Sequence, residues 1–208
     1  MARRVTLSDG GRPLSELYAE LAQTPTALDF EALALRAATA LSSPSPYIVE
    51  ADFLTGRYLD EARSAAPRHV DDDAPPPPPL CPVVARLDAL RAALAAATGK
   101  PLLPSAEIEI LCYRPGGSYR RHVDDGPTIQ LPGKGVRRSI SLLLYLTSDD
   151  WADSDGGELR IHGDAGGYMD VLPKAGTLVL FDSATVAHEV LPTKRPRVLL
   201  AGWLQQAR

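Results

Sequence analysis

A succession of short β-type segments limits the folds that the second half of this chain can adopt. Runs rich in valine, isoleucine, leucine and aromatic residues recur after residue 105, and clusters of glycine, proline, aspartate and serine separate them. These runs cover residues 108–113, 139–146, 158–162, 169–172, 177–181, 187–190 and 198–203. Many short strands separated by turns are typical of a β-sandwich or a closed jelly-roll barrel, and the pattern leaves both open.

The first 104 residues differ because helical patterns replace most of the strands. Helices are expected over 14–21, 26–41, 55–64 and 83–98, and a strand over 47–53. In the last of these helices Leu87, Leu90 and Leu94 recur at helical spacing, which predicts packing against a sheet. We therefore expect an N-terminal helical support with a strand–helix lead-in over 1–104. A β core over 105–208 would complete one structural domain.

Proline accounts for 19 of the 208 residues, about twice its usual share of ~5%. Five prolines are consecutive, at residues 75–79. Such a run cannot form a helix and adopts polyproline II geometry when it is ordered. We predict that residues 65–82 form a connecting loop.

The charge balance argues against a nucleic-acid partner. The chain carries 22 lysines and arginines against 26 aspartates and glutamates, a net charge of −4, and no basic stripe. No apolar run approaches the ~20 residues that span a bilayer, and residues 1–10 lack the apolar region of a secretory signal. The two cysteines, Cys81 and Cys112, fit a reducing compartment and are expected to be buried as small hydrophobic residues. We therefore expect a cytoplasmic protein without a membrane partner, and the sequence leaves a nuclear or organellar location open.

Two of the four histidines lie in patterns that suit a metal ion. His122 and Asp124 form a His-x-Asp sequence, and on a strand residues i and i+2 point to the same face. His188 lies in another strand-like run, 64 positions after Asp124. Two imidazoles and one carboxylate, with other coordination positions open, form the facial triad of non-haem Fe(II) oxygenases.

A possible anion site follows the second histidine. Arg197 comes nine positions after His188, so it can lie near the same barrel mouth on the next strand, and its guanidinium suits a carboxylate. Tyr113, Tyr119 and Tyr145 lie on neighbouring segments, and phenol hydroxyls are suitable donors to carboxylate oxygens.

Taken together, these segments resemble the Fe(II)/2-oxoglutarate-dependent dioxygenases of the prolyl 4-hydroxylase superfamily, closest to the branch of the HIF prolyl hydroxylases and their bacterial relatives. The resemblance covers about 107–204. It is carried by Cys112-Tyr113, Tyr119-Arg120-Arg121-His122-Val123-Asp124, Tyr145-Leu146, Asp150-Trp151, Gly156-Gly157-Glu158-Leu159-Arg160-Ile161, His188-Glu189-Val190-Leu191-Pro192, Arg197 and Trp203. The fold it implies is α+β, mainly β, with a double-stranded β-helix (jelly-roll) core and supporting N-terminal α-helices.

The resemblance also implies the ligands and the cofactors. His122, Asp124 and His188 match the iron ligands of the family. Arg197 matches the residue that pairs with the distal carboxylate of 2-oxoglutarate, and Tyr145 matches a tyrosine that helps to bind it. The implied cofactor is Fe(II), the co-substrates are 2-oxoglutarate and O₂, and ascorbate is an optional addition.

Three aromatic residues complete the implied site. Tyr113 matches a cofactor-binding tyrosine near the iron, and we expect Tyr119 and Trp203 to lie near the substrate. No catalytic residue beyond the metal centre is expected. His162 and His69 are expected to be exposed, and Gly156-Gly157 to form a turn that needs positive φ.

The implied activity is hydroxylation of prolyl residues in a protein or peptide, with release of succinate and CO₂. The family's substrate-closing element is not recognisable in residues 69–80, and residues 126–138 also differ, so the substrate does not follow from the resemblance. One alternative is a hydroxylase of a free amino acid or another small molecule. A second, of another class, is a non-catalytic metal-binding sensor on the same barrel.

Strand alternation further predicts which side chains share the pocket. Leu143 would face inward with Tyr145, and Leu199 inward with Arg197, whereas Leu142 and Leu144 would face the supporting helices.

Overall fold

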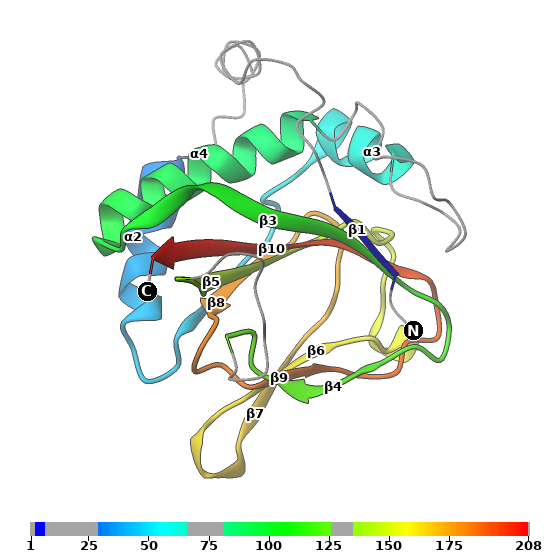
Figure 1. The fold of residues 1–208 in the computed structure, drawn as a ribbon. Helices are drawn as coiled ribbons and strands as arrows, with labels where there is room; N and C mark the ends of the chain where they lie inside the picture. Colours follow the sequence, from blue (N-terminus) through cyan, green and yellow to red (C-terminus); the bar gives the residue numbers. More distant parts are fainter. Residues whose placement is uncertain (1–2, 7–28, 66–80, 126–134, 208) are drawn as a thin grey trace.

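The computed structural model describes residues 3–6, 29–65, 81–125 and 135–207, and it shows two antiparallel sheets with helices over one of them (Figure 1). The helices are α2 (Phe30–Leu41), α3 (Gly56–Ala65) and α4 (Cys81–Thr98), with 3₁₀ turns η2 (Asp153–Asp155) and η3 (Asp164–Gly166). The strands are β1 (Arg3–Thr6), β2 (Tyr47–Glu50), β3 (Leu102–Tyr113), β4 (Tyr119–His122), β5 (Val136–Tyr145), β6 (Leu159–His162), β7 (Tyr168–Val171), β8 (Leu178–Asp182), β9 (His188–Val190) and β10 (Arg197–Ala207).

The two sheets divide the molecule into layers. The larger sheet has the strand order β1-β3-β10-β5-β8-β2, and the smaller sheet has the order β4-β9-β6-β7. One apolar cluster joins α2, α3 and α4 to the outer face of the larger sheet, and a second fills the space between the sheets. The predicted fold class, a mainly β jelly-roll core supported by N-terminal helices, is confirmed.

Strand β5 shows how the sequence divides these two clusters. Leu142 and Leu144 belong to the cluster under the helices, whereas Leu143 and Tyr145 belong to the cluster between the sheets. The same alternation puts Leu199 between the sheets. The predicted facing of these residues is therefore correct, because successive side chains of a strand point to opposite faces.

The start of helix α2 is set by a local hydrogen bond. Helix α2 begins at Phe30, because Asp29 is the N-cap and its carboxylate accepts a hydrogen bond from Ala32 N at 2.9 Å. The helix packs against α4 and buries Leu33, Ala34 and Ala37. Its buried stripe anchors the helical layer on the larger sheet.

Some strands differ from the expectation. β2 ends at Glu50, before Asp52, which has a positive φ of 58°. β3 begins at Leu102 because it pairs with the full length of β10, up to Gln206. The arginine-rich β1 and β4 are additional strands whose polar sequences lack the apolar alternation used to find the others.

Some expectations fall outside the described residues, namely the helix over 14–21, His69 and the proline run. Two strands from the first 104 residues, β1 and β2, form the edges of the larger sheet. The division of the chain at residue 105 stays a prediction.

None of the helices in the described ranges is long and apolar enough to cross a membrane.

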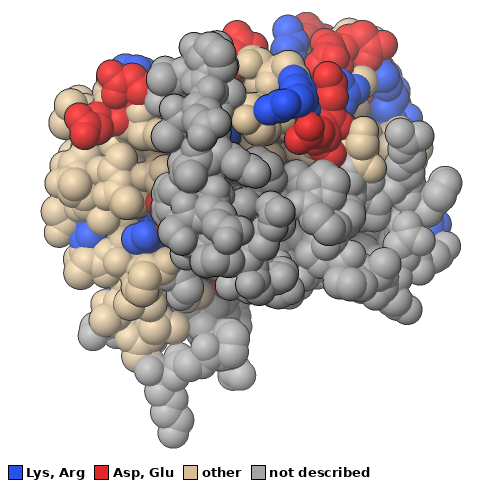
Figure 2. Space-filling model, turned by 90° about the horizontal axis from the view of Figure 1, so that it is seen from above, with Lys and Arg blue, Asp and Glu red and all other residues tan. Residues whose placement is uncertain are grey.

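Figure 2 shows the molecule from above. On the described part of this face, acidic and basic side chains lie interspersed.

Candidate metal centre

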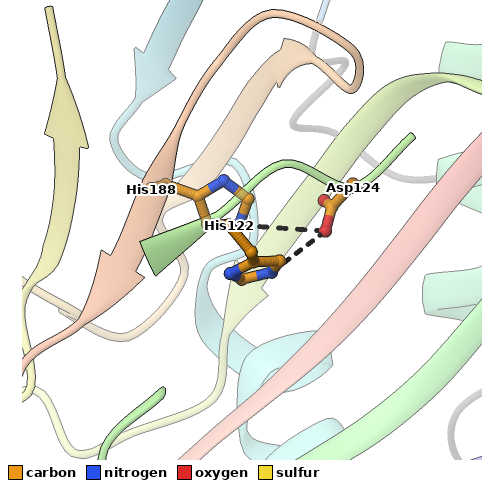
Figure 3. A group of neighbouring side chains, drawn as sticks. All are labelled: His122, Asp124 and His188. Carbon is orange, nitrogen blue, oxygen red and sulfur yellow. Dashed lines mark ion pairs between the residues drawn. The ribbon is translucent and has the colours of Figure 1, made fainter. Parts of the chain in front are cut away.

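Two histidines and one aspartate meet at one end of the barrel (Figure 3). His122 is the last residue of β4, and His188 is the first of β9 and pairs with it across the sheet. The Asp124 Oδ1 lies 3.3 Å from His122 Nε2 and 3.9 Å from His188 Nε2. The possible ligand atoms of all three lie within 4.8 Å of one another, which is close enough to hold one metal ion.

Asp124 reaches this position from a turn. The expectation that His122 and Asp124 share a strand is wrong, because β4 ends at His122 and Asp124 follows it in a turn. The turn is held by a hydrogen bond from Asp125 N to Ser183 O at 2.8 Å. The carboxylate is thereby fixed beside the strand end.

Backbone carbonyls orient both imidazoles. His122 Nδ1 lies 2.9 Å from Arg120 O, and His188 Nδ1 lies 3.1 Å from Val186 O. Because a carbonyl oxygen only accepts, each Nδ1 donates to its carbonyl, and the Nε2 of each ring is left facing Asp124. Burial also lowers the pKa of His188, although the nearby Asp124 opposes this. A neutral imidazole with a free Nε2 is the form that binds a metal.

Asp124 is held as a carboxylate by the side chains around it. Burial alone would raise its pKa, but hydrogen bonds from His122, Ser141 and Trp203 and the nearby His188 lower it to about 2. Ser141 Oγ donates to Asp124 Oδ2 at 2.6 Å and also contacts Ser183 Oγ at 2.8 Å. The sequence analysis did not identify Ser141. Its position on the barrel-facing side of β5 is the only sequence feature that points to it.

Arg197 is fully buried between the sheets and lacks an anionic partner among the described residues. Its Nε donates to Gly157 O at 2.8 Å, and one terminal nitrogen donates to Tyr145 Oη at 3.4 Å. The other terminal nitrogen has no hydrogen-bond partner within the part of the chain that the structure describes. A buried guanidinium with an unused N–H group fits a carboxylate supplied by a bound molecule.

The position of Arg197 differs from the expectation of a shared barrel mouth. It contacts Tyr145, whereas Asp124 contacts Ser141, four residues earlier on β5. Four strand residues span roughly 13 Å. Arg197 therefore lies deeper in the barrel than the His122–Asp124–His188 group.

Two tyrosines line this deeper part. The guanidinium carbon of Arg197 lies 5.1 Å from the ring centroid of Tyr113 and 5.0 Å from that of Tyr145. Burial raises the pKa of both phenols, although the charge of Arg197 opposes this. The hydroxyls remain protonated and available as donors.

Gly156 and Gly157 form the predicted positive-φ turn, with φ of 68° and 76°. A Cβ at Gly157 would lie 3.2 Å from Arg197 Cδ and 3.0 Å from the Thr193 side chain. A glycine is thus required where the backbone approaches and holds Arg197.

The two residues expected near a substrate lie beside the ligands. Tyr119 is 46% exposed, and its ring meets His122 edge-on at 4.7 Å. Trp203 is buried, and Arg138 lies 3.7 Å from its ring centroid. His162 stands outside the ligand group, as expected, but it is half-buried and not exposed, because it pairs with Glu189 at 2.9 Å.

Comparison with known proteins agrees with this geometry. Residues 108–205 match the 2OG-Fe(II) oxygenase superfamily. A PKHD-type hydroxylase of Teredinibacter turnerae is 40% identical over 95 residues, which cover 45% of this chain and 40% of that protein. A PKHD-type hydroxylase of Burkholderia ambifaria is 34% identical over 120 residues, 54% of this chain and 51% of the relative. The chain therefore spans about half or less of the length of these relatives.

Solved structures extend the similarity across the fold. A Pseudomonas putida prolyl-4-hydroxylase has a TM-score of 0.68 and 29% identity, covering 84% of this chain and all of that one. A Trichoplax adhaerens prolyl hydroxylase, solved with a hypoxia inducible factor peptide fragment, shares the fold, with a TM-score of 0.69, 17% identity and 95% coverage of each chain. Residues 108–205 are thus similar to the 2OG-Fe(II) oxygenase superfamily, and the chain has the fold of the prolyl 4-hydroxylase type. Together with the His-Asp-His group, this similarity implies Fe(II) as cofactor and 2-oxoglutarate as co-substrate.

Proposed function

We propose that this protein hydroxylates prolyl residues in a protein or peptide, consuming 2-oxoglutarate and O₂ and releasing succinate and CO₂. The observation that carries the proposal is that a His-Asp-His group shares one barrel with a buried arginine that lacks an anion among the described residues. The similarity to PKHD-type hydroxylases and to the Pseudomonas putida prolyl-4-hydroxylase supports proline as the target.

His122, Asp124 and His188 would hold the iron. Their donor set, two imidazoles and one carboxylate, suits Fe(II) and leaves coordination positions for other molecules. When bound, Fe(II) together with 2-oxoglutarate and O₂ supplies the oxidising chemistry of the reaction. The protein contributes the orientation of the ligands, through the carbonyls of Arg120 and Val186.

Arg197, Tyr145 and Tyr113 would bind 2-oxoglutarate. The unused N–H group of Arg197 and the buried phenol of Tyr145 can donate to its distal carboxylate. Tyr113 packs beside the same guanidinium and helps to exclude water. In these surroundings the cation and the carboxylate attract each other more strongly than in water.

The peptide would enter from the end of the barrel where the metal group lies. Tyr119 and Trp203 lie beside the ligands there and would contact the target residue. The solved complex of the Trichoplax adhaerens enzyme contains a peptide, which supports a substrate of this kind.

The test measures hydroxylation and succinate together. The full chain is incubated with Fe(II), 2-oxoglutarate and O₂, with and without ascorbate, and with either proline-containing peptides or free proline. We expect a mass gain of one oxygen on a prolyl residue and one succinate for each hydroxylated peptide. Product from free proline alone would support the small-molecule alternative, and iron binding without turnover would support the sensor.

Two neighbouring aspartates provide a matched control. Asp124→Ala should abolish iron binding and turnover, whereas Asp125→Ala should retain both, because the Asp125 contact that holds the turn comes from its backbone N–H. Full turnover by the Asp124 variant would contradict the assignment of the metal centre.

A further inference from the structure

Arg138 is a buried charged residue of β5 that takes no part in the metal centre or in the Arg197 site. It is 6% exposed and precedes Ser141, whose hydroxyl bonds to Asp124, by three positions. Strand alternation from Ser141 would turn Arg138 toward the helical layer. Its guanidinium instead contacts Trp203, which belongs to the apolar cluster between the sheets. Arg138 therefore faces the barrel.

A change of register on β5 accounts for this direction. Leu204 of β10 pairs with Ile140, but the next residue, Gln205, pairs with Arg138. Ser139 is therefore an extra residue on β5. One extra residue in a strand reverses the facing of the side chains beyond it, and bulges of this kind are common beside functional sites, where they redirect a side chain. The bulge at Ser139 thus turns Arg138 from the helical layer to the barrel.

The side chain of Glu107 holds the guanidinium of Arg138 in one plane. The Glu107 carboxylate accepts hydrogen bonds from Arg138 Nε at 3.2 Å and from Arg138 Nη2 at 2.6 Å. Gln205 Nε2 donates to the same carboxylate at 3.4 Å. Two-point binding by a carboxylate fixes the orientation of an arginine as well as balancing its charge. Arg138 is therefore oriented by side chains from β3 and β10, which lie next along the sheet.

The oriented guanidinium covers one face of the Trp203 indole. Its central carbon lies 3.7 Å from the ring centroid, which is a stacking distance. Glu107 and Trp203 are paired residues of β3 and β10, so the carboxylate stands beside the ring that its arginine covers. These three residues, Glu107, Arg138 and Trp203, form a stack that the indole would have to break in order to rotate.

The indole connects the stack to a metal ligand. Trp203 donates a hydrogen bond to the Asp124 carboxylate, and Ser141, its register partner on β5, donates a second one at 2.6 Å. Indole has a single N–H donor, so this bond requires one orientation of the ring. Asp124 Oδ1 in turn faces the Nε2 atoms of both histidines of the metal group. The position of the carboxylate therefore depends on the position of the indole.

We infer that Arg138 is a positioning residue of the metal centre. It stacks on Trp203, keeps the indole N–H on Asp124 and thereby fixes the carboxylate where the metal ion binds. Residues that hold a metal ligand without touching the metal sustain the affinity of the site. The inference rests on the metal centre of the proposed function, and it does not depend on which substrate is hydroxylated.

Iron affinity measured in a double-mutant cycle tests this coupling. Arg138→Met removes the guanidinium but keeps a long side chain, and Trp203→Phe keeps an aromatic ring without the N–H. We expect each single variant to lower the affinity of the full chain for Fe(II) by roughly tenfold, measured by anaerobic calorimetry. Because both changes remove the same hydrogen bond, the double variant should bind iron about as tightly as either single one. A loss of roughly a hundredfold, the product of two independent effects, would overturn the inference.

Two further arginine variants separate orientation from charge and from a general effect on the strand. Arg137→Met changes the exposed neighbour of Arg138 and should leave the iron affinity unchanged. Arg138→Lys keeps the cation and can still pair with Glu107, but an ammonium lacks the plane that covers the indole. It should weaken iron binding as Arg138→Met does, and it decides the question if the methionine variant does not fold. Full iron affinity in Arg138→Lys would overturn the inference.

Fluorescence tests the stack without any metal. The chain has two tryptophans, so Trp151→Phe leaves Trp203 as the remaining one. In the metal-free Trp151→Phe chain, time-resolved anisotropy should show an indole that moves only with the whole molecule. Adding Arg138→Met should introduce a local motion of the ring on the nanosecond scale, whereas adding Arg137→Met should not. The same decay with and without Arg138 would contradict the stack.

The two measurements also distinguish this inference from the proposed function. Failure of the unmodified chain to bind Fe(II) would refute the metal centre, and the anisotropy would still decide whether Arg138 holds Trp203. Iron binding and hydroxylation that persist unchanged in Arg138→Met and Arg138→Lys would overturn the role of Arg138 and leave the proposed function standing. Iron affinity that depends on Arg138, without hydroxylation of any substrate, would support the role and refute the proposed function.

Discussion

Arg197 combines full burial with the absence of an anion among the described residues. Burying a charge without a partner costs several kcal/mol, so the fold must compensate for it locally. Gly157 O, the Tyr145 hydroxyl and two aromatic rings provide part of that compensation. The remaining N–H group is the part that a bound carboxylate would satisfy.

Replacing this arginine should therefore act on the co-substrate. We expect Arg197→Ala to raise the 2-oxoglutarate concentration needed for half-maximal succinate formation by roughly tenfold or more, since hydrogen bonds to charged groups contribute about 1.5–3 kcal/mol. Initial rates at varied 2-oxoglutarate measure the effect. Arg195→Ala is the matched control, because Arg195 pairs with Asp150 and Asp155 outside the barrel. An unchanged requirement in the Arg197 variant would refute the role.

Ser141 acts on the metal centre through Asp124. Its hydroxyl lies 2.6 Å from the carboxylate, and both side chains are buried. Hydrogen bonds to a ligating carboxylate fix its orientation and sustain metal affinity. Ser141 is therefore a positioning residue.

Removing this hydroxyl should weaken iron binding while the fold persists. We expect Ser141→Ala to lower the affinity for Fe(II) by roughly tenfold or more, measured by anaerobic calorimetry, with Ser141→Thr restoring most of it. Ser139→Ala is the control, because Ser139 is a buried serine of the same strand with no contact to Asp124 in the structure. Equal iron affinity in the two alanine variants would contradict the positioning role.

At the scale of single elements, β5 connects the helical layer to the site. Leu144 packs under the helices while its neighbours Leu143 and Tyr145 line the barrel. The strand pairs with both β10 and β8, so its alternation sets the facing of the whole sheet.

Truncating one of its helix-facing residues should destabilise the whole chain. Leu144→Ala is expected to lower the free energy of unfolding by about 2–5 kcal/mol, as for other fully buried leucines. Leu35→Ala, at an exposed position of α2, should change it by no more than about 0.5 kcal/mol. Urea unfolding followed by circular dichroism measures both. A similar small loss in the two variants would show that the helical layer contributes little to stability.

At the scale of the molecule, the site depends on both sheets. His122 and His188 come from the smaller sheet, whereas Ser141 and Arg197 come from the larger one. The helices cover the far face of the larger sheet and keep its outer leucines from water. The first 104 residues therefore support the site without contributing any of these four residues.

A truncated protein that begins at residue 105 should consequently fail to form a stable monomer. A fragment of residues 105–208 would lose β2, the neighbour of β8, and would expose Ile110, Leu142 and Leu200 on its outer face. Exposed apolar patches of this size promote association. Size-exclusion chromatography and dye binding should show aggregation, with the full chain as control. A monomeric, cooperatively folded fragment would contradict this expectation.

Local patterns in the sequence are sufficient to predict the strand succession and the facing of Leu142 to Tyr145, whereas the residues of the metal group follow from the resemblance to a known family. These patterns are local because strand alternation and helical spacing depend on neighbouring residues alone. The turn that places Asp124, the hydrogen bond from Ser141 and the depth of Arg197 follow only from the tertiary structure. Each depends on which distant strands pair and in which register, and a single sequence does not specify that pairing.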